Sequence, residues 1–250
     1  MNIIPLMKEF LTKRELSITE EQRKKLLQTY EFVKTFFDLA KNEKVMMGAH
    51  GLDHGLRVAG NAYIISQGEG VNPFLPVLAS LLIDVGRSVD DPRSKNWQHG
   101  YVSIEIADPF LDKLNIPAVD KKIVLDTLRD HSRLNEYVEN LTDVVKIVMD
   151  ADRLATLGPL GPLRAAATRH QLPLVTPEFS DTKSEDDNIA SVLQDVEFRQ
   201  GEWFDMLWTN TGRKMGEKKY AFHQEYVKAV KEDVKPMYEA CHEVGLPLDF

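Results

Sequence analysis

Helical spacing of the apolar residues is the feature that most constrains the fold of this chain. Between Thr19 and Lys44, apolar side chains fall on one face of a helix, at Leu26, Leu27, Tyr30, Val33, Phe37 and Ala40. Thr19, with Gln22 three residues later, fits a capping box that opens this helix. The alternation of apolar and polar residues that marks a half-buried strand is absent. The sequence therefore predicts an all-α fold.

The same spacing predicts further helices, whose ends coincide with glycine, proline or polar residues. Their expected ranges are Asp53–Gln67, Pro73–Val85, Trp97–Leu114, Val119–Asp130, Leu141–Leu157, Ile189–Asn210 and Lys214–Val244. The segment Pro173–Asp187 is rich in proline, acidic and hydroxyl residues and predicts an exposed loop. We expect a single helical domain over residues 45–250, with residues 1–44 as an N-terminal helical extension.

Composition excludes several classes of protein. The formal charge of −8 disfavours binding to a nucleic-acid duplex, although a cleft of opposite local charge can still take a small anion. No apolar run approaches the ~20 residues that span a membrane, and the N-terminus lacks the apolar core of a secretion signal. The single cysteine, Cys241, excludes an internal disulfide framework and suits a reducing cytoplasm, where we expect the protein.

Five polar residues stand at helix-sized intervals in a chain with only seven histidines: His54, Asp84, His99, His131 and Asp152. Imidazoles and carboxylates on separate buried helices are the groups that a metal site in a helical domain needs. A single histidine is more often a hydrogen-bonded residue at a helix end, so the argument depends on the set. We predict that these side chains meet in one site.

The local context of these residues separates stronger from weaker candidates. Asp84 ends an apolar run, where a carboxylate is costly to bury unless a cation or a metal pairs with it. His50 and His54 would share one helical face, with His54 deeper in the helix and His50 at its start. Asp150 and Asp152 point to different faces, so at most one of them can share a site with His54.

Taken together, these motifs resemble the HD superfamily of metal-dependent phosphohydrolases, and in particular its small bacterial members. The similarity extends over roughly residues 44–234. It rests on His50-x-x-x-His54-x-x-Arg57-Val58, Ala79-Ser80-Leu81-Leu82-Ile83-Asp84-Val85-Gly86, His99-Gly100-x-x-Ser103, His131-Ser132, Asp150-Ala151-Asp152-Arg153-Leu154 and Thr209-x-Thr211-Gly212-Arg213. The resemblance implies an HD-type helical bundle.

The resemblance also implies roles for individual residues. His54, Asp84 and Asp152 match metal ligands, and Asp84 matches a carboxylate that can bridge to a second metal. His99 and His131 match positions that hold a second metal in binuclear members and line the substrate site in mononuclear ones. Candidates for phosphate contacts are Arg57 and Arg153 first, with Arg87 and Arg133 beside them.

One position departs from the family pattern. Ile83 stands where the family has the histidine of its His-Asp pair, and isoleucine cannot bind a metal. Three protein ligands and a water still make an open catalytic site, although we expect a lower metal affinity. The mixed nitrogen and oxygen donors suit Mn, Fe, Ni, Co or Zn and do not choose among these divalent metals.

Three functions follow, in order of preference. The first is a metal-dependent hydrolase of a small phosphate ester, with a nucleotide as one candidate. The second is a catalytically degenerate descendant that binds a nucleotide or a partner protein, which the replacement at Ile83 favours. The third is a di-iron oxygenase or a lyase on the same scaffold. The N-terminal helix leaves two arrangements open, packing on the domain or a homodimer contact.

Overall fold

The computed structural model describes residues 18–40, 47–95, 98–138, 141–176 and 189–246. Helices make up the regular structure of these residues, and no strand occurs among them. The prediction of a single all-α domain is therefore confirmed. Within the described residues, no helix is long and apolar enough to cross a membrane.

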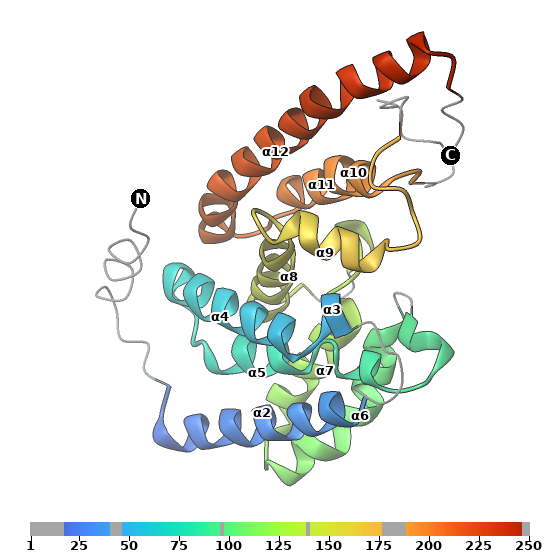
Figure 1. The fold of residues 1–250 in the computed structure, drawn as a ribbon. Coiled ribbons are helices and arrows are strands. Elements are labelled where there is room, and N and C mark those ends of the chain that lie inside the picture. Colours follow the sequence, from blue (N-terminus) through green and yellow to red (C-terminus); the bar gives the residue numbers. More distant parts are fainter. Residues whose placement is uncertain (1–17, 41–46, 96–97, 139–140, 177–188, 247–250) are drawn as a thin grey trace.

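Three helices pack together at the centre of the fold, α4 (Leu52–Glu69), α5 (Phe74–Leu82) and α8 (Asp143–Thr156) (Figure 1). Helix α5 is apolar along nearly its whole length, so it is buried on most of its sides. Val58, Leu78 and Val148, one from each helix, are fully buried in a common hydrophobic core. Burial of these apolar faces fixes the positions of the three helices.

The N-terminal part of the domain covers one side of this core. Helix α2 (Glu20–Ala40) lies across α5 and contributes Val33 and Phe37 to the same core, so it packs on the domain (Figure 1). The predicted capping box is confirmed: Thr19 N donates to Gln22 Oε1 at 2.9 Å, and Gln22 N donates to Thr19 Oγ1 at 3.2 Å. The predicted boundary at residue 44 lies outside the described residues.

The chain then forms a second pair of helices, α6 (His99–Lys113) and α7 (Ala118–Asp130). Two 3-10 turns, η1 (Val85–Ser88) and η2 (Pro92–Lys95), connect α5 to α6. A third 3-10 turn, η3 (Asn135–Tyr137), follows α7. This arrangement brings η1, which follows the C-terminal end of α5, beside α6.

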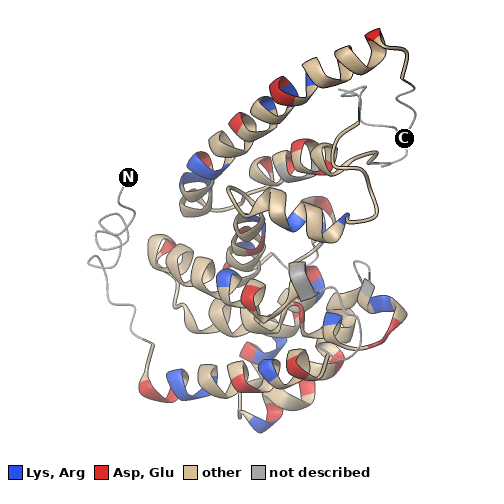
Figure 2. Ribbon diagram, in the orientation of Figure 1, with Lys and Arg blue, Asp and Glu red and all other residues tan. Residues whose placement is uncertain are grey.

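The C-terminal part consists of α9 (Gly161–Thr168), α10 (Val192–Gln194), the π-helical turn η4 (Asp195–Arg199), α11 (Gln200–Asp205) and α12 (Asn210–Glu243). Helix α12 packs on α8 and α4 near its start and extends away from the rest of the molecule towards its end (Figure 1). Acidic and basic residues alternate along its outer half (Figure 2). Pairs such as Lys228–Glu232 make this half a solvated helix.

Two helix predictions are wrong in part. The helix expected over Pro73–Val85 ends at Leu82, and the chain turns through Asp84 into η1. The helix expected over Ile189–Asn210 is divided, and its last segment ends at Asp205. The buried Asp150 carboxylate accepts the backbone N–H groups of Trp208 at 2.8 Å and Thr209 at 2.7 Å, which draws that backbone out of the helix.

Two helices were not expected, α3 (Met47–His50) and α9. Helix α9 follows Gly158-Pro159, which predicts a helix end, and its own start is set by Pro162 in its first turn. The predicted loop at Pro173–Asp187 is irregular in its described residues 173–176, and the remainder lies outside the described residues.

The close approach of η1 to α6 leads to a first prediction. A Cβ at Gly86 would lie 2.5 Å from the His99 carbonyl oxygen and 2.6 Å from the Ser103 nitrogen. We expect Gly86→Ala to lower the free energy of unfolding by about 1–3 kcal/mol, because backbone atoms must move apart. Gly60→Ala is the matched control, since Gly60 is exposed in α4 with nothing within 4 Å of a Cβ there.

The control should raise the free energy of unfolding by about 0.5–1 kcal/mol, because alanine favours a helix over glycine. Urea denaturation followed by circular dichroism measures both values. Equal effects of the two substitutions would contradict the close contact at Gly86.

Candidate metal centre

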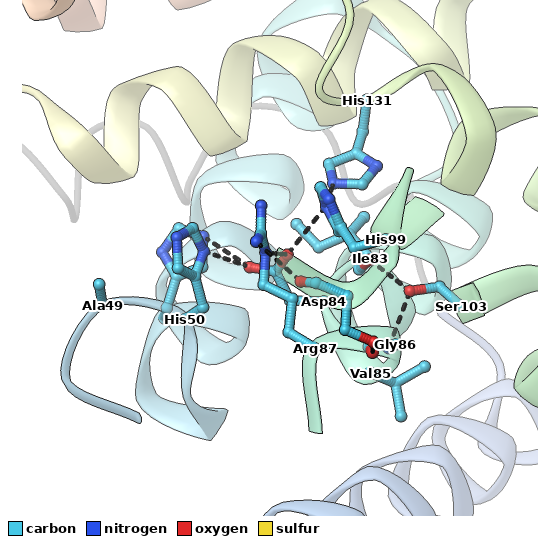
Figure 3. Close-up of polar contacts among 12 residues, drawn as sticks. Ala49, His50, Ile83, Asp84, Val85, Gly86, Arg87, His99, Ser103 and His131 are labelled. Atoms are coloured by element: carbon cyan, nitrogen blue, oxygen red, sulfur yellow. Dashed lines mark hydrogen bonds and ion pairs between the residues drawn. The ribbon is translucent and has the colours of Figure 1, made fainter. Parts of the chain in front are cut away.

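The five polar residues singled out in the sequence meet at one place, although they come from five elements. Two come from helix interiors, His54 from α4 and Asp152 from α8. The other three stand at helix ends: Asp84 follows α5, His99 begins α6 and His131 directly follows α7. The packing of these helices therefore brings the donors into one cluster. Figure 3 shows three of them, Asp84, His99 and His131.

Asp84 lies at the centre of the cluster, with its side chain only 6% exposed. Its Oδ2 is 3.0 Å from His50 Nδ1, and its Oδ1 is 3.2 Å from His99 Nε2 (Figure 3). The same Oδ2 is 3.5 Å from His54 Nε2. Two groups of donors that could hold a metal ion share this carboxylate. They are His50, His54 and Asp84, and Asp84, His99 and His131.

His54 and Asp152 carry polar atoms that the described residues leave without hydrogen bonds. His54 is fully buried, and neither of its ring nitrogens has a hydrogen-bond partner there. The Oδ1 atom of Asp152 is in the same condition, although it lies 3.0 Å from His54 Nε2. Buried polar atoms without partners are costly, and a cation between them would satisfy both. These residues therefore fit a metal ion.

His131 is held in the tautomer that a metal ligand needs. Its Nδ1 lies 2.9 Å from the Leu128 carbonyl oxygen, which can only accept, so Nδ1 carries the proton. The Nε2 atom then keeps its lone pair and faces His99 Nε2 at 2.9 Å. Burial, together with the nearby His99, lowers the pKa of His131 to about 4. His131 is therefore neutral at physiological pH.

The other pKa values favour metal binding in the same way. Burial lowers the pKa of His50 to about 3, so this imidazole is neutral. Burial alone would raise the pKa of Asp84, but His50 and Arg87 outweigh it and hold that pKa well below its usual range. The pKa of Asp152 is also lowered, because His54 and Arg164 outweigh burial. Neutral imidazoles beside ionised carboxylates are the protonation states in which these groups bind metals.

Ile83 makes no polar contact through its side chain, which is fully buried in the hydrophobic core. His50 reaches Asp84 from the other side of the cluster. The expectation that His50 and His54 share one helix was wrong, because Gly51 is extended (φ −77°, ψ −177°) and separates α3 from α4. This break turns the His50 ring towards the Asp84 carboxylate. His50, which the sequence placed only at a helix start, therefore belongs to the metal donors.

Of the arginines that the resemblance suggested as phosphate contacts, one lies within the cluster and the others are held outside it. Arg87 Nε donates to Asp84 Oδ1 at 2.9 Å, within the cluster. Arg57 pairs with Asp53 at the surface, with one third of its side chain exposed. Arg153 is held elsewhere, since it donates to the Met206 carbonyl at 2.6 Å. The structure does not bring Arg153 to the site, because this carbonyl and its neighbours hold the guanidinium.

Arg133 is likewise held outside the cluster, by the Tyr101 hydroxyl at 2.6 Å. Arg164 is the arginine that the sequence did not indicate. Its Nε donates to the Ala49 carbonyl at 3.0 Å, and its Nη2 lies 3.2 Å from His50 Nδ1. No local pattern links these residues, which are more than a hundred positions apart in the chain.

Comparison with known proteins agrees with this geometry. Residues 51–157 match the family model of the HD domain. Residues 51–157 therefore form an HD domain. A solved protein from Lactobacillus plantarum has a TM-score of 0.67 and 18% identity, covering 87% of this chain and 98% of that chain. An HD-superfamily hydrolase from Bacillus thuringiensis has a TM-score of 0.60 and 23% identity, covering 84% of this chain and 97% of that chain.

The structure of Bacillus subtilis YpgQ in complex with ADP is also similar, with a TM-score of 0.61 and 21% identity over 85% of this chain and 96% of that chain. At such identities the likeness establishes the HD fold. No curated protein matches the sequence. The resemblance to the HD superfamily that the motifs indicated is thus confirmed.

The shared position of Asp84 gives a second prediction. We expect Asp84→Asn to weaken binding of Mn²⁺ at least tenfold, because the substitution removes the one negative donor common to both groups. Asp53→Asn serves as the control, since that carboxylate is 64% exposed and faces Arg57. Isothermal titration of the metal-stripped protein gives the affinities. The same affinity in the parent and in Asp84→Asn would rule out Asp84 as a ligand.

Proposed function

We propose that this protein is a metal-dependent hydrolase that acts on a phosphate ester. The observation that carries the proposal is that two groups of metal donors share one buried carboxylate, that of Asp84. The partnerless atoms of His54 and Asp152 support it. The HD domain of residues 51–157 and the likeness to an HD-superfamily hydrolase from Bacillus thuringiensis agree with it. A divalent metal bound here would polarise the phosphoryl group and lower the pKa of a bound water.

The residues divide into holding and lining roles. His54, Asp84 and Asp152 would hold the metal, as the resemblance implies, and His50 would hold it with them. His99 and His131 would line the reacting group or hold a second ion on the other side of Asp84. The division of the histidines follows the two donor groups. Asp152 belongs to neither group, and its Oδ1 lies 3.0 Å from Nε2 of His54, a member of the first.

Exposure indicates the side from which a substrate would approach. The His54 and His99 side chains are each 1% exposed, whereas those of His50 and Asp152 are 14% and 20% exposed. The cluster is therefore closed at its base and open between His50 and Asp152. A phosphoryl group entering on that side would meet the metal donors directly.

A nucleotide is the substrate that we favour among phosphate esters. The support comes from YpgQ, which shares this fold and was solved in complex with ADP. A negative overall charge does not oppose the proposal, because two arginines contact the site, Arg87 at Asp84 and Arg164 at His50.

A metal-free binding protein is the second candidate function, and one contact favours it. The Arg87 Nε lies 2.9 Å from Asp84 Oδ1, so its guanidinium already neutralises the central carboxylate. In a site that no longer binds a metal ion, the Arg87 guanidinium would take the place of that ion. The loss of the family's histidine at Ile83 agrees with this alternative.

Activity against model esters separates the two candidates. We expect the Mn²⁺-loaded protein to release phosphate from p-nitrophenyl phosphate or from a nucleotide, and EDTA to abolish the release. Asp84→Asn should lower kcat by about 100-fold or more, since the metal and its water are lost together. Asp53→Asn should keep the parent rate. No binding of Mn²⁺, together with no hydrolysis of any nucleoside mono-, di- or triphosphate, would favour the metal-free binding protein.

The role of His50 as a metal ligand can be tested by moving the histidine from position 50 to position 83. We expect His50→Ala to weaken Mn²⁺ binding, because one neutral donor of the His50, His54 and Asp84 group is removed. His170→Ala is the matched control, since His170 is an exposed histidine. Adding Ile83→His to His50→Ala should restore part of the affinity, because it returns the donor to the family's usual position.

Isothermal titration measures the metal affinity of these variants, and thermal unfolding checks that each remains folded. An unchanged affinity of His50→Ala for Mn²⁺ would show that His50 does not replace the histidine that the family has at position 83. The three remaining ligands, His54, Asp84 and Asp152, would then suffice.

A further inference from the structure

Arg164 stands at the opening of the cluster, outside the residues that match the HD family model. It belongs to α9, and two contacts hold its guanidinium. The Nε donates to the Ala49 carbonyl at 3.0 Å, and Nη2 lies 3.2 Å from His50 Nδ1. Both contacts fall on α3, so Arg164 ties α9 to the short helix that carries His50.

The charge of Arg164 is not compensated by a close carboxylate. Arg87 and Arg57 each form an ion pair, with Asp84 and Asp53. Among the residues that the structure describes, no carboxylate lies at ion-pair distance from Arg164, and its remaining N–H groups have no partner there. Burial lowers the pKa of the guanidinium, while the more distant Asp152 and Asp84 raise it, so the group stays charged. A largely buried cation of this kind is stabilised by an anion.

The His50 ring cannot satisfy both of its neighbours. Its Nδ1 faces Asp84 Oδ2 at 3.0 Å, which requires an N–H, and Arg164 Nη2 at 3.2 Å, which requires a lone pair. A neutral imidazole nitrogen offers one or the other. If the lone pair of Nδ1 is used for a metal ion, Arg164 loses its acceptor. The Nη2 N–H groups are then free for another oxygen.

We propose that Arg164 is the phosphoryl-binding residue of this site, and that metal and phosphoryl anion bind with positive coupling through His50. The planar guanidinium can donate two parallel hydrogen bonds to the non-bridging oxygens of a phosphate. Its contact with His50, whose side chain is 14% exposed, places these donors at the open side of the cluster. This inference rests on the proposed function, because it assigns the substrate contact of the same site.

The test is a pair of titrations by calorimetry, with inorganic phosphate and Mn²⁺ as the probes. In the parent, saturating Mn²⁺ should tighten phosphate binding, and phosphate should tighten Mn²⁺ binding by the same factor. We expect Arg164→Gln to weaken phosphate binding more than tenfold in the presence of Mn²⁺. Its affinity for Mn²⁺ alone should stay equal or rise, because a neighbouring positive charge is removed.

Two further variants control the interpretation. Arg164→Lys keeps the charge but not the two parallel donors, so it should bind phosphate with intermediate affinity. It also serves as the second variant if Arg164→Gln loosens α3, which thermal unfolding would reveal. Arg23→Gln removes an exposed arginine on α2 and should behave as the parent.

The outcomes separate this inference from the proposed function. If the parent binds Mn²⁺ and Arg164→Gln binds phosphate as the parent does, the role of Arg164 is overturned and the metal site stands. If the parent binds no Mn²⁺, the proposed hydrolase fails. Phosphate binding that still depends on Arg164 would then support the anion site alone, and phosphate binding that is absent or independent of Arg164 would overturn it.

Discussion

Compensation of one buried negative charge, on Asp84, is the constraint on which the arrangement of this site depends. A carboxylate that is 6% exposed must be paired, because its desolvation costs several kcal/mol. The groups that surround it come from α3, α4, α6 and the turn after α5: His50, His54, His99 and Arg87. The packing of these helices therefore determines how a metal could bind. The contacts of these side chains with Asp84 in turn stabilise the packing of the helix ends.

The turn that carries Asp84 is fixed by a separate set of contacts. Ser103 Oγ donates to the Ile83 carbonyl at 2.8 Å and accepts the Gly86 N–H at 2.9 Å (Figure 3). One hydroxyl from α6 thus holds the backbone on both sides of Asp84. Gly86 allows this approach, because any side chain there would meet the α6 backbone. Catalytic groups on such rigid supports keep their geometry without reorganisation.

The sequence predicted the fold class and the residues that gather, because both depend on local patterns. The apolar spacing identified the core helices, and buried carboxylates such as Asp84 are conspicuous in an apolar run. Contacts between distant short elements were missed. The turn of His50 towards Asp84 depends on the extended Gly51, and the contact of Arg164 with His50 joins residues 114 positions apart. Arg153 matched a motif, but a carbonyl supplied by Met206 holds it elsewhere.

The central claim is that the donors around Asp84 hold a metal ion, with His50 in place of the histidine lost at Ile83. A crystal structure of the Zn²⁺-soaked protein, with anomalous scattering recorded at the zinc edge, tests it most directly. The account predicts an anomalous peak about 2.1 Å from nitrogens of His50 and His54 and from an Asp84 oxygen. A cluster without a peak, in which Arg87 still pairs with Asp84, would contradict it.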